Sequence, residues 1–177
     1  MCRYAMSYYK PHYACFECRK TFKRRLMWDI RRDHDSVAEA KCPQCASLMA
    51  NMGKDFEAPK MDDLKAWQHI KTLYSVGISF HSCGCTGPGY IPNTKDKLID
   101  YLEEQKQAAL HNLEFWRNRI EPTDSRELNR DLSKNWNFIT KIPGTLVNKK
   151  TEVRNEDAIH FWIGRLKEIE LRIIKVP

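Results

Sequence analysis

The pattern of apolar and polar positions divides the chain into an N-terminal part with only short apolar stretches and a longer C-terminal part with helical periodicity. Apolar residues recur every three or four positions in four segments, which we predict to be helices. These segments cover about residues 62–77, 95–120, 124–142 and 155–173. The expected buried positions are Leu64, Trp67, Ile70 or Lys71 and Tyr74; Leu98, Leu102, Ala109, Leu113, Trp116 and Ile120; Leu128, Leu132, Trp136 and Ile139; and Ile159, Trp162, Leu166, Ile169 and Ile173.

The ends of the four predicted helices carry recognisable start and stop residues. Short polar and acidic side chains satisfy free backbone N–H groups at a helix start, and glycine or proline ends a helix. The expected starts are Asp62 and Asp63, Asn93 or Thr94, Asp124 with Glu127 at capping-box spacing, and Asn155. The expected stops are Gly77, Pro122, and Pro143 with Gly144.

Four cysteines in the N-terminal part form two Cys-x-x-Cys pairs. Cys15 and Cys18 are followed after 23 residues by Cys42 and Cys45. A Cys-x-x-Cys turn presents two sulfurs to one metal, and zinc prefers four tetrahedral thiolates. We therefore predict one zinc ion bound by these four residues. Four thiolates leave no open coordination position, so this zinc should be structural and not catalytic.

The sequence around these pairs resembles the zinc-ribbon family over about residues 10–50. The stretch YACFECRKTF (residues 13–22) resembles the first zinc knuckle, with an aromatic residue before and after the pair, and CPQC (residues 42–45) resembles the second. Many zinc ribbons have glycine after the second pair, where this chain has Ala46. The resemblance implies a fold and a metal, and it implies function only loosely because zinc ribbons serve many proteins.

Together these features predict an α+β protein in which a small, β-rich N-terminal zinc ribbon packs on a mostly α-helical C-terminal region. We expect the zinc ribbon with its basic patch to occupy residues 1–58 and the helical domain residues 59–177. Within the helical domain, residues 80–92 read as a loop rich in glycine, proline and cysteine.

A second group of soft ligands lies in that loop. His81, Cys83 and Cys85 alternate, which would put their side chains on one side of an extended segment. They could hold a second metal ion, form a redox-active pair, or be small thiols packed in a tight turn. The candidates for a fourth ligand are Cys2, His12, His34 and His69.

The net charge of +7 is concentrated at the N-terminus, because residues 1–32 contain nine basic and two acidic residues. Clustered positive charge is typical of proteins that bind polyanions. The expected nucleic-acid-binding residues are Arg19, Lys20, Lys23, Arg24, Arg25, Arg31 and Arg32. Phe16, Phe22 and Trp28 lie among them and either stack on bases or pack against the ribbon.

The main functional prediction is a basic zinc-ribbon protein that binds nucleic acid. RNA or the ribosome is preferred over specific DNA, because no recognition-helix pattern is present. One alternative is a protein–protein adaptor with a structural zinc; a second is a redox or metal-dependent enzyme that uses the His81 loop. No catalytic motif supports an enzyme. We expect a cytoplasmic protein without a membrane partner, since the chain has no run of about 18 apolar residues and no apolar leader.

Overall fold

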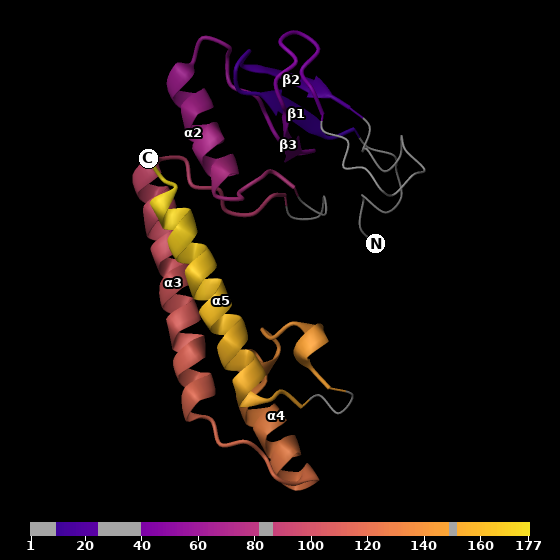
Figure 1. The fold of residues 1–177 in the computed structure, drawn as a ribbon, viewed down its shortest axis with the longest axis vertical. Coiled ribbons are helices and arrows are strands. Elements are labelled where there is room, and N and C mark those ends of the chain that lie inside the picture. Colours follow the sequence, from indigo (N-terminus) through magenta and orange to yellow (C-terminus); the bar gives the residue numbers. More distant parts are fainter. Residues whose placement is uncertain (1–9, 25–39, 82–86, 149–151) are drawn as a thin grey trace. The chain divides into compact units, whose positions relative to one another are not determined.

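The computed structural model describes residues 10–24, 40–81, 87–148 and 152–177 (Figure 1). These residues form a three-stranded antiparallel sheet near the N-terminus and the helices α2 to α5, which confirms the α+β class. Contacts divide the chain into two compact units. The N-terminal unit consists of residues 1–98 with 175–177, and the helical unit consists of residues 99–174.

The sheet contains β1 (His12–Cys15), β2 (Lys20–Lys23) and β3 (Ala50–Gly53) in the order β2-β1-β3. Cys15 faces Lys20 and Tyr13 faces Phe22 across the β1–β2 pair. Because side chains alternate along a strand, β1 contributes to two clusters. Tyr13 and Cys15 join a cluster with Cys42 and Met49, whereas Ala14 joins a cluster with Met52, Phe56 and Trp67.

Helix α2 (Leu64–Ser75) begins where the sequence predicts. Asp63 is its N-cap and accepts a hydrogen bond from the backbone N–H of Ala66 at 3.0 Å. Gly77 follows the helix with a φ of 81°, a left-handed conformation that suits glycine. The expected buried face is wrong at two positions. Trp67 and Ile70 are buried, but Leu64 and Tyr74 are 60% and 41% exposed.

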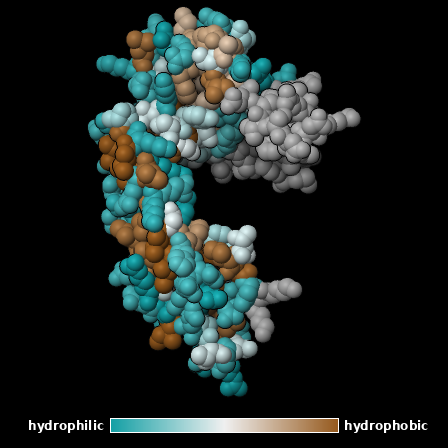
Figure 2. All heavy atoms as spheres, in the orientation of Figure 1, coloured by the Kyte–Doolittle hydropathy of each residue, from teal (hydrophilic) through white to brown (hydrophobic). Residues whose placement is uncertain are grey.

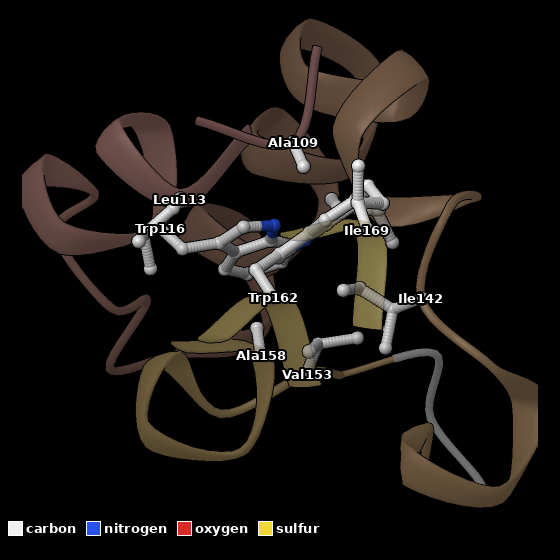
Figure 3. Close-up of a cluster of buried hydrophobic side chains, with 9 residues drawn as sticks. Ala109, Leu113, Trp116, Ile142, Val153, Ala158, Trp162 and Ile169 are labelled. Carbon is white, nitrogen blue, oxygen red and sulfur yellow. The ribbon is translucent and has the colours of Figure 1, made fainter. Parts of the chain in front are cut away.

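The helical unit is built from α3 (Lys95–Asn118) from Ile99 onward, α4 (Ser125–Ile139) and α5 (Asn155–Ile174), with a short 3₁₀ turn at Gly144–Leu146. Helices α3 and α5 run antiparallel and side by side (Figure 1), and an ion pair of 3.1 Å joins Lys106 to Glu170. Figure 3 shows Trp116 and Trp162 together in the middle of the core. The buried members of this core are Ala109, Leu113, Trp116, Ile139, Ile142, Val153, Ala158, Trp162 and Ile169.

The predicted helix starts at Thr94 and Asp124 are confirmed. Thr94 Oγ1 accepts from the N–H of Lys97 at 3.3 Å, and Asp124 accepts from the N–H groups of Arg126 and Glu127 at 2.7 and 2.8 Å. The capping box differs in one respect. The Glu127 carboxylate accepts from the N–H and hydroxyl of Thr123, at 2.8 and 2.9 Å, and not from the N–H of Asp124.

Asn155 does not cap α5 as expected, because its side chain is engaged elsewhere. It is the first residue of α5, and its Oδ1 accepts from Arg119 Nη1 at 2.7 Å. The guanidinium of Arg119, whose side chain is 2% exposed, also donates to Asp131 at 2.7 Å and to the carbonyl of Val153 at 2.9 Å. It lies 4.9 Å from the ring centre of Trp116. This buried charge therefore links α3, α4 and α5.

Two apolar residues expected in the core of the helical unit lie at its surface. Ile120 follows the end of α3 and is 90% exposed. Trp136 is 57% exposed, and it directly follows Asn135, where α4 is kinked with a φ of −113° and a ψ of 20°. The helical period that predicts an inward Trp136 assumes an unbroken helix. None of the helices in the described part of the chain has the length and apolar character needed to cross a membrane.

Candidate metal centre

Two turns bring the four predicted cysteines together. Cys15 ends β1 and Cys18 lies in the turn that leads to β2. Cys42 and Cys45 lie in a second turn, which is closed by a bridge between Lys41 and Leu48. All four sulfur atoms lie within 4.8 Å of one another. The Sγ atoms of Cys15 and Cys45 are 3.5 Å apart, and those of Cys18 and Cys42 are 4.0 Å apart.

These separations fit a shared metal ion. Four sulfurs bound tetrahedrally at about 2.3 Å from zinc lie about 3.8 Å from one another, whereas disulfide-bonded sulfurs are separated by about 2.05 Å. The observed 3.5 and 4.0 Å match the first distance. A set of four soft thiolates is suited to zinc or to iron–sulfur chemistry and unsuited to magnesium or calcium. The four cysteines could therefore bind a metal ion such as zinc.

Each turn also directs a backbone amide at a sulfur atom. The N–H of Cys18 donates to Cys15 Sγ, and the N–H of Gln44 donates to Cys42 Sγ, both at 3.4 Å. Such donors delocalise the negative charge of metal-bound thiolates and fix their orientation. The two turns therefore share one design, in which the first cysteine of each pair receives a backbone hydrogen bond.

The residue after each pair adopts a left-handed backbone conformation. Arg19 has a φ of 50° and Ala46 a φ of 60°. This conformation costs a residue with a Cβ atom roughly 1–2 kcal/mol, which explains why many zinc ribbons have glycine here. Ala46 is nevertheless accommodated, and its N–H donates to the carbonyl of Cys42 at 2.9 Å. Alanine at this position adds strain to the turn but leaves Cys45 where it can bind a metal ion.

Without a metal, the thiols of Cys15, Cys18 and Cys45 would differ in how readily they lose a proton. Hydrogen bonds from the hydroxyl and backbone of Ser47, and from Cys18, lower the pKa of Cys45 to about 6. The hydrogen bond with Cys45, followed by burial, raises the pKa of Cys18 to about 12. Burial is the main cause that raises the pKa of Cys15. A thiolate at Cys45 is therefore favoured near neutral pH, and a bound cation must displace the protons of Cys15 and Cys18.

Helix α2 holds the first turn in place. Phe16 packs edge-on against Trp67, with ring centres 6.4 Å apart, and Arg19 Nε donates to the carbonyl of Met61 at 2.9 Å. An exposed ion pair of 3.8 Å joins Glu17 to Lys71. These contacts place α2 in the same compact unit as the sheet. The division into a zinc ribbon over residues 1–58 and a helical domain over residues 59–177 remains a prediction.

The described residues of the basic patch lie along β2 and the first turn. Lys20, Lys23 and Arg24 are exposed, and Arg19 is half-buried. Because side chains alternate along a β-strand, Lys20 and Lys23 of the edge strand β2 lie on opposite faces of the sheet. The remaining predicted members, Arg25, Arg31 and Arg32, lie outside the described residues.

Lys41, which the sequence analysis missed, extends this set of cations. It is exposed, and its carbonyl accepts a hydrogen bond from Arg24 Nη1 at 3.3 Å. Its position directly before Cys42 is the feature of the sequence that could have assigned it to this set. Two of the aromatic residues in the patch pack inward and do not project freely. Phe22 packs on the cysteine cluster and Phe16 on α2, while Trp28 lies outside the described residues.

The proposed second metal group stays a prediction. His81 is exposed, whereas Cys83 and Cys85 lie outside the described residues, as do Cys2 and His34 among the suggested fourth ligands. The other two suggested ligands have neighbours of their own. His12 packs edge-on against Phe56, with ring centres 6.5 Å apart, and His69 Nε2 lies 2.8 Å from the carbonyl of Pro92. In the described ranges, the four-cysteine group alone gathers three or more metal-ligating side chains.

Comparisons with protein-family models, with curated proteins and with solved structures find no match for this chain.

Proposed function

We propose that this protein is a zinc-ribbon protein that binds nucleic acid, with RNA or the ribosome as its target. The observation that carries the proposal is the set of exposed cations on the rigid cysteine-containing turns and on β2: Lys20, Lys23, Arg24 and Lys41. Cationic side chains bind phosphates and release their counterions. Because the turns are already ordered, fewer degrees of freedom are lost when these side chains bind.

The metal in this proposal is zinc, and its role is structural. Four thiolates complete its coordination, so no position remains for a substrate or an activated water molecule. Zinc would fix the β1–β2 turn to the Cys42–Cys45 turn, and this link holds Lys20 near its partner Gln44, whose Oε1 accepts from Lys20 Nζ at 2.8 Å. The metal therefore supports nucleic-acid binding, because it keeps the cations of two separate turns in a constant arrangement.

The arrangement of the cations favours RNA over specific DNA. They line an edge strand and two turns, and none of them belongs to a helix that could enter a major groove. Contacts from such a surface go mainly to phosphates, which fits irregular or single-stranded RNA and the ribosome. The predicted stacking role of Phe22 and Phe16 is not part of this proposal, because both rings pack inward.

The test is a charge reversal on β2. The variant Lys20→Glu/Lys23→Glu/Arg24→Glu should bind a labelled single-stranded RNA more weakly than wild type. With about 0.7 contributed per phosphate on single strands, the slope of log affinity against log salt should flatten by roughly 2. Zinc content should not change, because these side chains are not ligands.

The matched control is Lys65→Glu/Lys95→Glu/Lys97→Glu, which reverses three exposed lysines of the same unit. It changes the net charge by the same amount and should retain most of the affinity. Equal losses in the two variants would show that net charge alone matters. If wild type does not bind RNA even at low salt, the proposal is rejected and the protein–protein adaptor becomes the preferred function.

A further inference from the structure

Trp136 is an ordered aromatic side chain that is exposed on α4. Its indole is 57% exposed. It directly follows the kink at Asn135, whose Nδ2 donates to Asp131 Oδ1 at 2.7 Å. The backbone carbonyl of Trp136 accepts from the N–H and the hydroxyl of Thr140 at 3.0 and 2.9 Å. A large apolar ring is thus held at the surface by a defined backbone conformation.

A stripe of cations runs along the exposed side of the same helix. Arg126, Arg130 and Lys134 are all exposed and are spaced four residues apart, which places them in one row over about 12 Å of helix. Lys141 continues the positive charge beyond the helix end. The row is distinct from the N-terminal basic patch, since it belongs to the helical unit.

The acidic residues of α4 neutralise this stripe only in part. Asp131 is turned inward to Arg119, and Glu127 is hydrogen bonded to Thr123. Within the described ranges, Arg126 and Lys134 have no ion-pair partner. Arg130 acts on the Glu127 carboxylate through its charge without forming a close ion pair. The stripe therefore presents positive charge that a ligand can neutralise.

The composition of this surface selects among anionic partners. Binding to a membrane surface requires a broad apolar helix face, but Leu132, Phe138 and Ile139 of α4 are directed to the core. In Figure 2 most of the visible surface of α4 is hydrophilic. A row of cations and a single exposed aromatic residue on one helix suit a single-stranded nucleic acid, whose phosphates pair with cations and whose bases stack on aromatic side chains.

We propose that the exposed side of α4, formed by Arg126, Arg130, Lys134 and Trp136, is a second nucleic-acid-binding surface that takes single-stranded RNA. This inference rests on the proposed function for the class of ligand, but different residues in a different unit carry it. Trp136 stacks on an unpaired base, while the three cations bind the phosphates that flank it. The neutral side chains of Asn129 and Ser133 lie on the same exposed side.

The test uses the full chain and two sets of variants. Trp136→Ala should weaken binding of a labelled oligouridine by roughly fivefold or more, because one stacking contact is worth about that. Trp136→Phe should recover most of the affinity, since it retains a ring for stacking. Arg130→Gln/Lys134→Gln should flatten the salt slope by about 1.4, which is two single-strand phosphate contacts. The control is Lys167→Gln, an exposed lysine on α5, and thermal unfolding confirms that each variant is folded.

The outcomes separate this inference from the proposed function. If the β2 charge reversal weakens binding and the α4 variants match wild type, the α4 surface is refuted while the proposed function stands. If the α4 variants weaken binding and the β2 reversal does not, the α4 surface is supported and the ribbon loses its role. Equal affinities of Trp136→Ala and Trp136→Phe would refute stacking. Binding to anionic vesicles that depends on Trp136, with no effect on RNA, would replace RNA by a membrane.

Discussion

Removing the metal from the four-cysteine site should unfold the three-stranded sheet and leave the core of the helical unit intact. A metal ion bound by all four cysteines would hold both turns together, and β1 and β2 are joined through the first of them. Since β1 is the central strand, its loss would release β2 and β3 together. The core of the helical unit draws its buried residues only from positions 109–169 and needs none of the cysteines.

The magnitude follows from what remains on the metal side of the sheet. Apart from cysteine and alanine, the buried residues of that cluster are Tyr13 and Met49. Burial of two such side chains contributes about 3–6 kcal/mol, whereas structural zinc in small zinc-binding domains contributes about 10–16 kcal/mol. A typical domain is stable by only about 5–15 kcal/mol. The free energy lost with the metal would therefore exceed the free energy that packing on this side of the sheet contributes.

The assay is hydrogen exchange followed by mass spectrometry before and after treatment with a zinc chelator, with metal content measured in parallel. Wild type should contain about one zinc per chain, and the amides of β1, β2 and β3 should lose protection when it is removed. Amides of α3 and α5 within the helical unit should stay protected and serve as the internal control. The double variant Cys15→Ser/Cys42→Ser should show the same exchange pattern without chelator. Full zinc retention by this variant, or an unchanged sheet after zinc removal, would refute the metal site.

The remaining predictions concern stability, which is measured as a shift in the urea midpoint. Ala46→Gly should stabilise the metal-bound protein by about 1 kcal/mol, because relief of left-handed strain outweighs the added freedom of the unfolded chain; a neutral effect would mean that the turn is unstrained. Gly53→Ala should destabilise the protein by roughly 2–4 kcal/mol, since φ is 92° and the new Cβ would lie 2.6 Å from the Phe80 carbonyl oxygen. Gly164→Ala should stabilise it by about 1 kcal/mol, because Gly164 lies within α5 and its new Cβ would meet no other atom within 4 Å. Arg119→Met should cost about 3–5 kcal/mol by leaving the largely buried carboxylate of Asp131 without its cation, and adding Asp131→Leu should recover much of it. Burial opposes ionisation of the Asp131 carboxyl, but hydrogen bonds from the guanidinium and a neighbouring amide lower its pKa below the ordinary 3.8. The contribution of this carboxylate to the free energy of unfolding is therefore complete above pH 3.8 and is lost as the pH falls through its lower pKa in the folded protein. Arg119→Met should remove this acid dependence.

The sequence by itself determined the features that depend on local chemistry. Two Cys-x-x-Cys pairs defined the four thiols that the fold brings within 4.8 Å, because each pair needs only one tight turn to align two sulfurs. The starts of α2 and α4 were likewise readable, since an Asp at position 63 or 124 caps amides two or three residues further along. Such signals act over a few residues and do not depend on the rest of the chain.

The tertiary structure alone decided where distant polar groups meet. Asn155 reads as a helix cap in the sequence, yet Arg119, 36 residues earlier, takes its side-chain oxygen. Trp136 reads as buried, yet the side-chain bond from Asn135 to Asp131 lies at a kink that breaks the helical period. In each case a buried or half-buried polar group has a side-chain partner that the pattern of apolar and polar positions does not show, and leaving such a group unpaired away from water costs about 1–3 kcal/mol.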